Sequence, residues 1–243
     1  MDLTDRQILI IKAIVEEFTE TANPVGSVTL EKKYKLGVSP ATLRNEMATL
    51  EEKGFLGQPH TSAGRTPTPT AVKFYVNEIM KEQQLSVAEE VSVKEKVWDH
   101  RFNHRSLLKE ATKVLAERSK FLSIAATEEG ETFHSGYANL LSSPEFYDID
   151  LTRQVFRLLD HGQSLLEIFS RASGNQPIHL LIGSHELGYD LLEPVSCIFA
   201  DFKIGDKKGS LGIIGPCRQQ YDRNIPLVRY VVNLINQIAQ DWD

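Results

Sequence analysis

Small polar side chains and one arginine gather on one side of a predicted helix near the N-terminus. Residues 39–53 read as a helix, because Ser39 can cap the first turn and Pro40 occupies a position that needs no N–H donor. Leu43, Met47 and Leu50 recur at helical spacing and predict the buried face. The opposite face carries Ala41, Asn45 and Ala48, flanked by Thr42, Arg44 and Thr49. Small residues permit close approach to a DNA groove, and Asn, Thr and Arg can hydrogen-bond to base edges. Ser39 can also donate to a phosphate.

The segment after this helix begins apolar and then becomes rich in Gly, Pro, Ser and Thr. Residues 55–68 therefore predict a short strand followed by a loop. Arg65 is the best single candidate there for a phosphate or minor-groove contact, and Gly64 leaves the backbone approachable. The other polar candidates are His60, Thr61 and Ser62, although a lone histidine is more often structural than functional.

Two further helices precede the predicted DNA-contacting helix. A capping box at Thr4 and Gln7 opens the first, whose apolar residues are Ile8, Ile11, Val15 and Phe18. Ser27 is the expected cap of the second, and a connection containing Gly37 leads to the third. This order matches a helix-turn-helix, with the strand and loop as its wing. Many such units bind proteins instead, so a protein-interaction module stays open.

The rest of the chain predicts a mixed α/β region. Helix is expected over residues 70–83 and over a more charged stretch, 84–122, whose apolar stripe is either core or a subunit contact. A polar loop at 128–131 and a helix at 151–170 follow. The later part predicts strands at 178–182, 195–202 and 211–214 and a closing helix at 225–239. The fold class is α+β, in three parts: residues 1–83, 84–122 and 123–243.

Composition predicts a cytoplasmic globular protein of 243 residues. The chain has no apolar run of 18 residues, and its N-terminus does not resemble a signal peptide. Its two cysteines, Cys197 and Cys217, read as buried strand residues in a reducing compartment. The net charge is −6, but residues 32–73 carry seven cations against three carboxylates. A local basic surface is therefore compatible with the acidic total. The alternative is that these cations are ordinary solvated surface residues without a binding role.

Motifs for catalysis and metal binding are missing from the sequence. His100 and His104 have i, i+4 spacing, but no glutamate follows the first histidine as a metalloprotease motif requires. Neither a Cys/His zinc spacing, nor a phosphate-binding loop, nor a GxSxG elbow occurs. We expect no enzymatic activity, no cofactor and no metal site.

Three N-terminal segments carry a family resemblance: TANPVGSVTL, LGVSPATLRNEMATLEEKGFL and QPHTSAGRTPT. Together with NLLSSPEF and LGIIGPCRQQYDRNIPLV, they resemble the HrcA family of heat-inducible transcription repressors. The matching segments follow the same order as in the family over residues 3–80 and again over about 136–235. The string from Gln58 to Arg65 is far more specific than a generic helix-turn-helix pattern.

The resemblance implies a bacterial cytoplasmic repressor that binds, as a homodimer, an inverted-repeat operator of chaperone operons. It also implies a winged helix-turn-helix domain, a helical linker and a GAF-like α/β domain, with chaperonin as a folding partner. By position, the implied DNA contacts are Ser39, Ala41, Thr42, Arg44, Asn45, His60, Thr61, Ser62 and Arg65.

One departure from the family concerns length. Family members carry an inserted dimerisation domain between positions that match about 122 and 134 here, where this chain has only LSIAATEEGETFH. The usual dimer contact is therefore reduced, and so is the GAF-like region. A regulator that senses a small molecule through the GAF-like domain is the alternative function.

Overall fold

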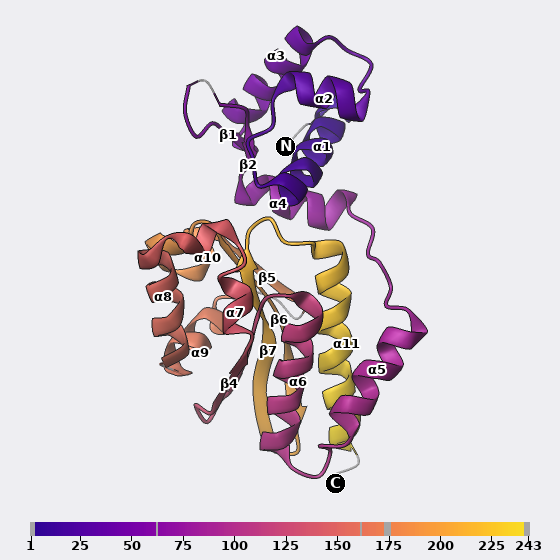
Figure 1. The fold of residues 1–243 in the computed structure, drawn as a ribbon, viewed down its shortest axis with the longest axis vertical. Helices are drawn as coiled ribbons and strands as arrows, with labels where there is room; N and C mark the ends of the chain where they lie inside the picture. The colour runs from indigo at the N-terminus through magenta and orange to yellow at the C-terminus, as the bar shows by residue number, and fades with distance from the viewer. Residues whose placement is uncertain (1–2, 62, 161, 173–175, 241–243) are drawn as a thin grey trace. The chain divides into compact units, whose positions relative to one another are not determined.

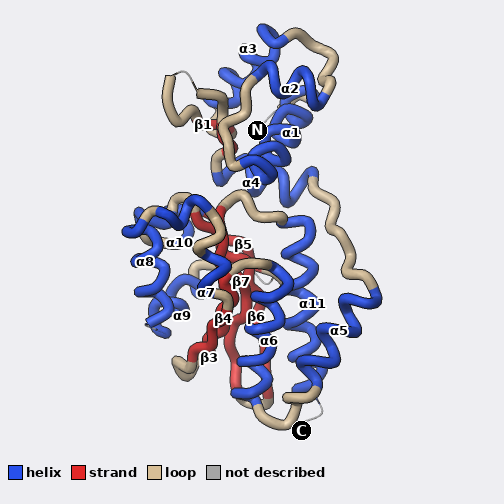
Figure 2. Tube along the Cα trace, viewed as in Figure 1, coloured by secondary structure: helices blue, strands red, loops and turns tan. Residues whose placement is uncertain are grey.

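The computed structural model describes residues 3–61, 63–160, 162–172 and 176–240 (Figure 1). The chain divides into two compact units. Unit 1 runs to Lys81 and includes Arg218–Gln220, and unit 2 comprises Glu82–Cys217 and the chain from Tyr221 onward. Figure 2 shows that unit 1 is mainly helical, whereas strands form the centre of unit 2.

Unit 1 begins with α1 (Asp5–Thr21), and the predicted capping box is confirmed, since Thr4 and Gln7 bond reciprocally. The predicted buried face is only partly right. Ile11 and Val15 are buried, but Ile8 is half-buried, and Ile10 and Ile14 lie in the core instead. The N-terminal half of α1 is apolar at four consecutive positions, so the period alone could not select the face that packs.

Helices α2 (Ser27–Tyr34) and α3 (Pro40–Glu52) follow. The N-cap of α2 is Gly26, not Ser27 as predicted; Ser27 is the first helical residue and is buried. Ser39 does cap α3 as predicted, and Gly54 adopts φ +79 just after the helix. Leu56–Gly57 (β1) and Thr66–Pro67 (β2) pair antiparallel, and α4 (Pro69–Phe74) continues as a π-helical turn to Ile79.

A buried carboxylate joins α1 to α2. Glu17 is 7% exposed, accepts a hydrogen bond from the Tyr34 hydroxyl at 3.1 Å and pairs with Lys33 at 2.7 Å. The hydrogen bond from Lys33 holds the pKa of Glu17 below its ordinary value. Burial, and then the hydrogen bond to Glu17, raises the pKa of Tyr34 to about 12. This cluster ties α1 to the last turn of α2, just before the connection that leads to α3.

Unit 2 is built on a five-stranded antiparallel sheet of order β4-β3-β7-β6-β5. The predicted strands are present as β5, β6 and β7, while β3 and β4 were not predicted. Residues 122–134 form β3, a short turn and most of β4. The strand bounds are Leu122–Thr127 (β3), Thr132–Ser135 (β4), His179–Ile182 (β5), Val195–Ile204 (β6) and Lys207–Pro216 (β7).

Helices cover both faces of this sheet (Figure 1). One face meets α6 (His104–Ser119) and α11 (Tyr221–Gln240), and the other packs against α8 (Ile149–Asp160) and α9 (Gly162–Ser170). Residues 84–122 form α5 (Val87–Trp98) and α6, not one continuous helix, and both belong to unit 2. The remaining short helices are α7 (Tyr137–Leu140), Pro144–Tyr147, α10 (Gly183–Leu187) and Asp190–Leu192. None of the described helices is both long and apolar enough to span a bilayer.

Candidate nucleic-acid interface

Helix α3 presents a polar outer face, because its apolar residues are committed to the core. Leu43 and Leu50 are fully buried and Met47 is 4% exposed. The predicted outer residues divide by exposure: Ala41, Arg44 and Asn45 are exposed, and Thr42, Ala48 and Thr49 are half-buried. The face can therefore approach a ligand closely and offers one guanidinium and one carboxamide.

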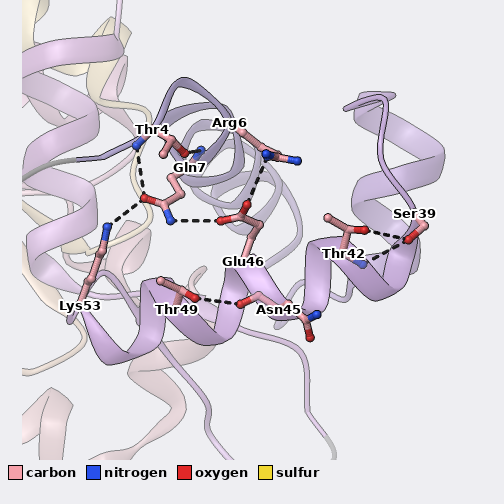
Figure 3. A network of polar contacts seen from close by, with 9 residues as sticks. All are labelled: Thr4, Arg6, Gln7, Ser39, Thr42, Asn45, Glu46, Thr49 and Lys53. Atoms are coloured by element: carbon pink, nitrogen blue, oxygen red, sulfur yellow. Dashed lines mark hydrogen bonds and ion pairs between the residues drawn. The ribbon is translucent and has the colours of Figure 1, made fainter.

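Local hydrogen bonds hold several polar side chains of α3 (Figure 3). The hydroxyl of Ser39 accepts from the backbone N–H of Thr42 at 3.2 Å and lies 3.0 Å from the Thr42 hydroxyl. The Thr49 hydroxyl donates to the backbone carbonyl of Asn45 at 3.2 Å. No hydrogen bond to the Asn45 carboxamide is recorded among the described residues, and in Figure 3 this group points away from α1.

The acidic residue in the middle of α3 is tied to α1. Glu46 pairs with Arg6 at 3.2 Å and accepts a hydrogen bond from the Gln7 side chain at 3.1 Å. The other end of the Gln7 carboxamide accepts from Lys53 at 3.0 Å, as Figure 3 shows. This network, which the sequence did not reveal, directs the Glu46 charge toward α1 and links α1 to α3 through side chains.

Gln58 organises the loop between β1 and β2. Its side-chain amide donates to the carbonyls of Thr61 and Ala63, both at 3.0 Å, and the N–H of Ala63 donates to the carbonyl of His60 at 2.8 Å. His60 and Thr61 are exposed at the tip of the loop, and the predicted contact Ser62 lies outside the described residues. Gln58 was not singled out from the sequence, although an amide flanking a turn can bond to the turn's backbone.

A backbone pairing holds the loop against the start of α2. The N–H of Val25 donates to the carbonyl of Arg65 at 2.8 Å, and the N–H of Arg65 donates back at 2.9 Å. Gly64 makes this approach possible, because a Cβ there would lie 2.5 Å from the Val25 backbone. The predicted site residue Gly64 therefore has a steric role within the protein.

The two arginines of the site have different surroundings. Arg65 is paired with Glu51 at 2.9 Å, and its side chain is 15% exposed. Its Nε is buried without a hydrogen-bond partner in the described structure. Arg44 is exposed and makes no ion pair with any described residue. A phosphate contact by Arg65 requires the pair with Glu51 to open, whereas Arg44 needs no such change.

A groove of about 490 Å³ brings the predicted segments together. Helix α3 contributes Arg44, the loop contributes Thr61, Gly64 and Arg65, and the start of α2 contributes residues 26–28. The structure therefore places the N-terminal half of α3 beside the loop. The start of α2 had not been predicted as part of this region.

The scattered histidines and cysteines do not assemble into a metal site within the described chain. His100 lies in the turn after α5, and His104 opens α6, so their helical spacing is not realised on one helix. Burial raises the pKa of the Cys197 thiol, which opposes thiolate formation. Cys197 lies buried in β6 as predicted, but the same prediction is wrong for Cys217, which follows the end of β7 and is half-buried.

Comparison with known proteins identifies the chain's relatives. A family model described as the HrcA protein C terminal domain matches residues 67–225. The chain belongs to the HrcA family. A heat-inducible transcription repressor HrcA of Pelotomaculum thermopropionicum is 26% identical, over 99% of this chain and 98% of the relative. The HrcA of Clostridioides difficile is 43% identical over 129 residues, which cover 53% of this chain and 38% of that protein.

This HrcA family member also resembles a solved structure. A crystal structure of a hypothetical protein matches with a TM-score of 0.81 and 19% identity, covering 100% of both chains. The likeness supports the fold alone. The alignment with the P. thermopropionicum HrcA runs over 341 residues, compared with 243 in this chain. At least 98 positions of that alignment (341 minus 243) are therefore gaps in this chain, although the alignment spans both proteins almost from end to end.

Proposed function

We propose that this chain is a heat-inducible transcription repressor that binds, as a homodimer, an inverted-repeat operator in double-stranded DNA. The observation that carries the proposal is the exposed face of α3, with Ala41, Arg44 and Asn45, beside the loop that Gln58 organises. Residues 1–83 act as a winged helix-turn-helix domain, and a helix with a small polar outer face can enter a major groove. The HrcA relatives named as heat-inducible repressors support the same function.

The site residues have different roles in this proposal. Asn45, Thr42 and Thr49 read base edges, and Ala41 and Ala48 allow the helix to approach. Arg44 and Ser39 contact phosphates at the edge of the groove. The loop supplies contacts to the adjacent backbone or minor groove through His60, Thr61, Ser62, Gly64 and Arg65.

The remaining residues supply assembly and regulation. Residues 84–122, expected to be a separate helical connector, belong to unit 2 as α5, α6 and the start of β3; in this proposal they contribute to the dimer, and with residues 123–243 they form a reduced GAF-like domain. The repressor works in the cytoplasm and depends on chaperonin for folding. Unfolded protein produced by heat then competes for chaperonin and relieves repression.

Selection of binding sites from random duplex DNA tests this function. We expect the full chain to enrich an inverted repeat whose half-sites lie a whole number of helical turns apart. Arg44→Ala should weaken binding to selected and scrambled DNA alike and lower the salt slope by about 1. Lys12→Ala, which removes a cation from α1 that is 47% exposed, should leave both unchanged. The proposal is contradicted if no repeat is enriched, or if both variants bind like the parent chain.

A cavity in unit 2 favours a second candidate, a regulator that responds to a small molecule. An open cavity of about 840 Å³ lies at one end of the sheet and is lined by Phe169, Phe202, Asp201 and Lys203 among others. Its size fits a metabolite, and its walls combine aromatic and charged groups. A thermal-shift screen with metabolites separates this candidate from chaperonin control, because a ligand that binds only the folded chain raises its melting temperature.

A further inference from the structure

The backbone of Arg65 is fixed, whereas its side chain has a choice of partners. Its N–H donates to the carbonyl of Val25 at 2.9 Å, and its carbonyl accepts from the Val25 N–H at 2.8 Å, directly before β2. Its guanidinium pairs with Glu51 at 2.9 Å, and the side chain is 15% exposed. Only the side chain therefore has to move for Arg65 to reach a partner other than Glu51.

The ion pair lies at the C-terminal end of α3. Glu51 belongs to the last turn of this helix and follows Arg44 by seven residues, which is about 10 Å along the helix axis. A carboxylate is unfavourable near the unpaired carbonyl groups of a helix C-terminus, and α3 has no basic residue in its last turn. Arg65 supplies the missing cation. The pair therefore stabilises the end of α3 while it directs the guanidinium away from the exposed N-terminal half of the helix.

The paired arrangement leaves one donor of Arg65 unsatisfied. Among the described residues, two buried side-chain atoms lack a hydrogen-bond partner, the Nε of Arg65 and an oxygen of Glu131. Of these two, only Arg65 belongs to unit 1 and to the candidate interface. A buried N–H without an acceptor raises the free energy of the arrangement that contains it. The ion pair therefore holds Arg65 against an opposing cost, and a ligand that satisfies the whole guanidinium can compete with Glu51.

The released side chain would enter a groove that already carries a second cation. Arg44 and Thr61 line this groove together with Arg65. Arg44 is exposed and makes no ion pair with any described residue, so it can hold an anion there without losing a partner. A phosphate group accepts two parallel hydrogen bonds from one guanidinium. A phosphate of double-stranded DNA beside Arg44 would thus offer Arg65 the acceptor that its Nε lacks.

We propose that Glu51 is a positioning residue that withholds Arg65 from DNA, so that the guanidinium is released only when a phosphate replaces the Glu51 carboxylate. The inference rests on the proposed function, because it adds a control to the same DNA-binding face. Binding of DNA then includes the breaking of the ion pair. The measured affinity is therefore the affinity of the released state multiplied by the fraction of chains that occupy this state.

DNA titrations of the full chain and of Glu51→Gln test this role. The glutamine keeps the shape of the side chain and removes the charge that holds Arg65. We expect binding to one half-site of the selected repeat to tighten by about three- to tenfold, as for the loss of a partly exposed ion pair. Glu52→Gln is the matched control, because it removes the same charge from the next residue, which is exposed and makes no ion pair with any described residue. The control should tighten binding by less than about twofold, since salt screens an exposed charge.

A double-mutant cycle shows whether Glu51 acts through Arg65. Arg65→Ala should bind DNA more weakly than the parent chain. Adding Glu51→Gln to Arg65→Ala should then change the affinity no more than Glu52→Gln does. A general repulsion between the Glu51 carboxylate and DNA would instead leave the full gain in the absence of Arg65. The cycle therefore separates a role in positioning from simple repulsion.

Proton exchange at the Nε of Arg65 gives a readout that needs no DNA. The Nε–H signal in a nitrogen–proton correlation spectrum of the full chain is assigned by its absence from Arg65→Ala. This proton should exchange with water faster in Glu51→Gln than in the parent chain, whereas Glu52→Gln should match the parent. Failure of the parent chain to bind DNA would refute the proposed function, and the exchange comparison would still decide whether Glu51 holds Arg65.

Three results would overturn the positioning role. The first is that Glu51→Gln binds DNA no more tightly than Glu52→Gln. The second is that the gain from Glu51→Gln persists in Arg65→Ala. The third is that the Nε–H of Arg65 exchanges equally fast in Glu51→Gln and in the parent chain.

Discussion

Gly64→Ala should detach the loop of the candidate interface from the start of α2. The added Cβ would lie 2.5 Å from the carbonyl carbon and oxygen of Val25 and 2.8 Å from its nitrogen. Backbone atoms cannot rotate away as a side chain can, so the pairing of Val25 with Arg65 must open. That pairing consists of two hydrogen bonds, at 2.8 and 2.9 Å. At about 0.5–1.5 kcal/mol net for each bond, the opening costs about 1–3 kcal/mol.

Hydrogen exchange of the full chain measures this opening directly. The amides of Val25 and Arg65 should exchange faster by about tenfold for each 1.4 kcal/mol lost. Affinity for selected DNA should fall as well, because the loop no longer borders α3. Gly57→Ala is the matched control in the same hairpin, where the added Cβ meets only the Thr66 hydroxyl at 3.7 Å. Exchange and affinity in Gly64→Ala that match those of Gly57→Ala would refute the reasoning.

Three further predictions concern unit 1. The depressed pKa of Glu17 means that its ionised form stabilises the fold above about pH 4.5 and that this contribution disappears as pH falls through the folded-state pKa. Melting temperatures measured from pH 7 to 3 should therefore drop less in Glu17→Gln than in the parent chain. Parallel curves for the two proteins would contradict this. Gln58→Ala removes two hydrogen bonds from the loop and should speed exchange at residues 58–65 without lowering the melting temperature by more than a few degrees; protection equal to that of the parent chain would count against the role of Gln58. Leu43→Ala leaves a cavity beneath α3 and should cost about 2–5 kcal/mol in a denaturant titration, and a loss below about 1 kcal/mol would show that α3 is not packed there.

Local patterns predicted much of unit 1 because its helix ends are marked by specific residues. Thr4 and Ser39 are side-chain caps with an acceptor at the required position, and the structure confirms both. The leucine spacing gave the orientation of α3 correctly, since only one face of that helix is apolar. In α1 several adjacent positions are apolar, so the choice of Ile10 and Ile14 depends on what α1 packs against.

Contacts between distant residues set the features that the sequence could not reveal. The pairs Glu46–Gln7 and Arg65–Glu51 each join different elements, and no periodicity brings them together. Strand β3 was not predicted, and its first residue was assigned to the preceding helix because Leu122 continues the apolar spacing of α6. The left-handed backbone at Lys120, with φ +62, ends that helix, and lysine gives little warning of this conformation.

The discrimination of selected from scrambled DNA by Asn45→Ala tests the central claim most directly. Asn45 is exposed on α3, and no hydrogen bond to its carboxamide is recorded among the described residues, so the substitution should not disturb the fold. The account predicts that affinity for the selected repeat falls by about 1–3 kcal/mol, or about 5–150-fold, while affinity for scrambled DNA stays the same. An unchanged ratio of the two affinities would contradict the claim that this face of α3 reads the DNA sequence.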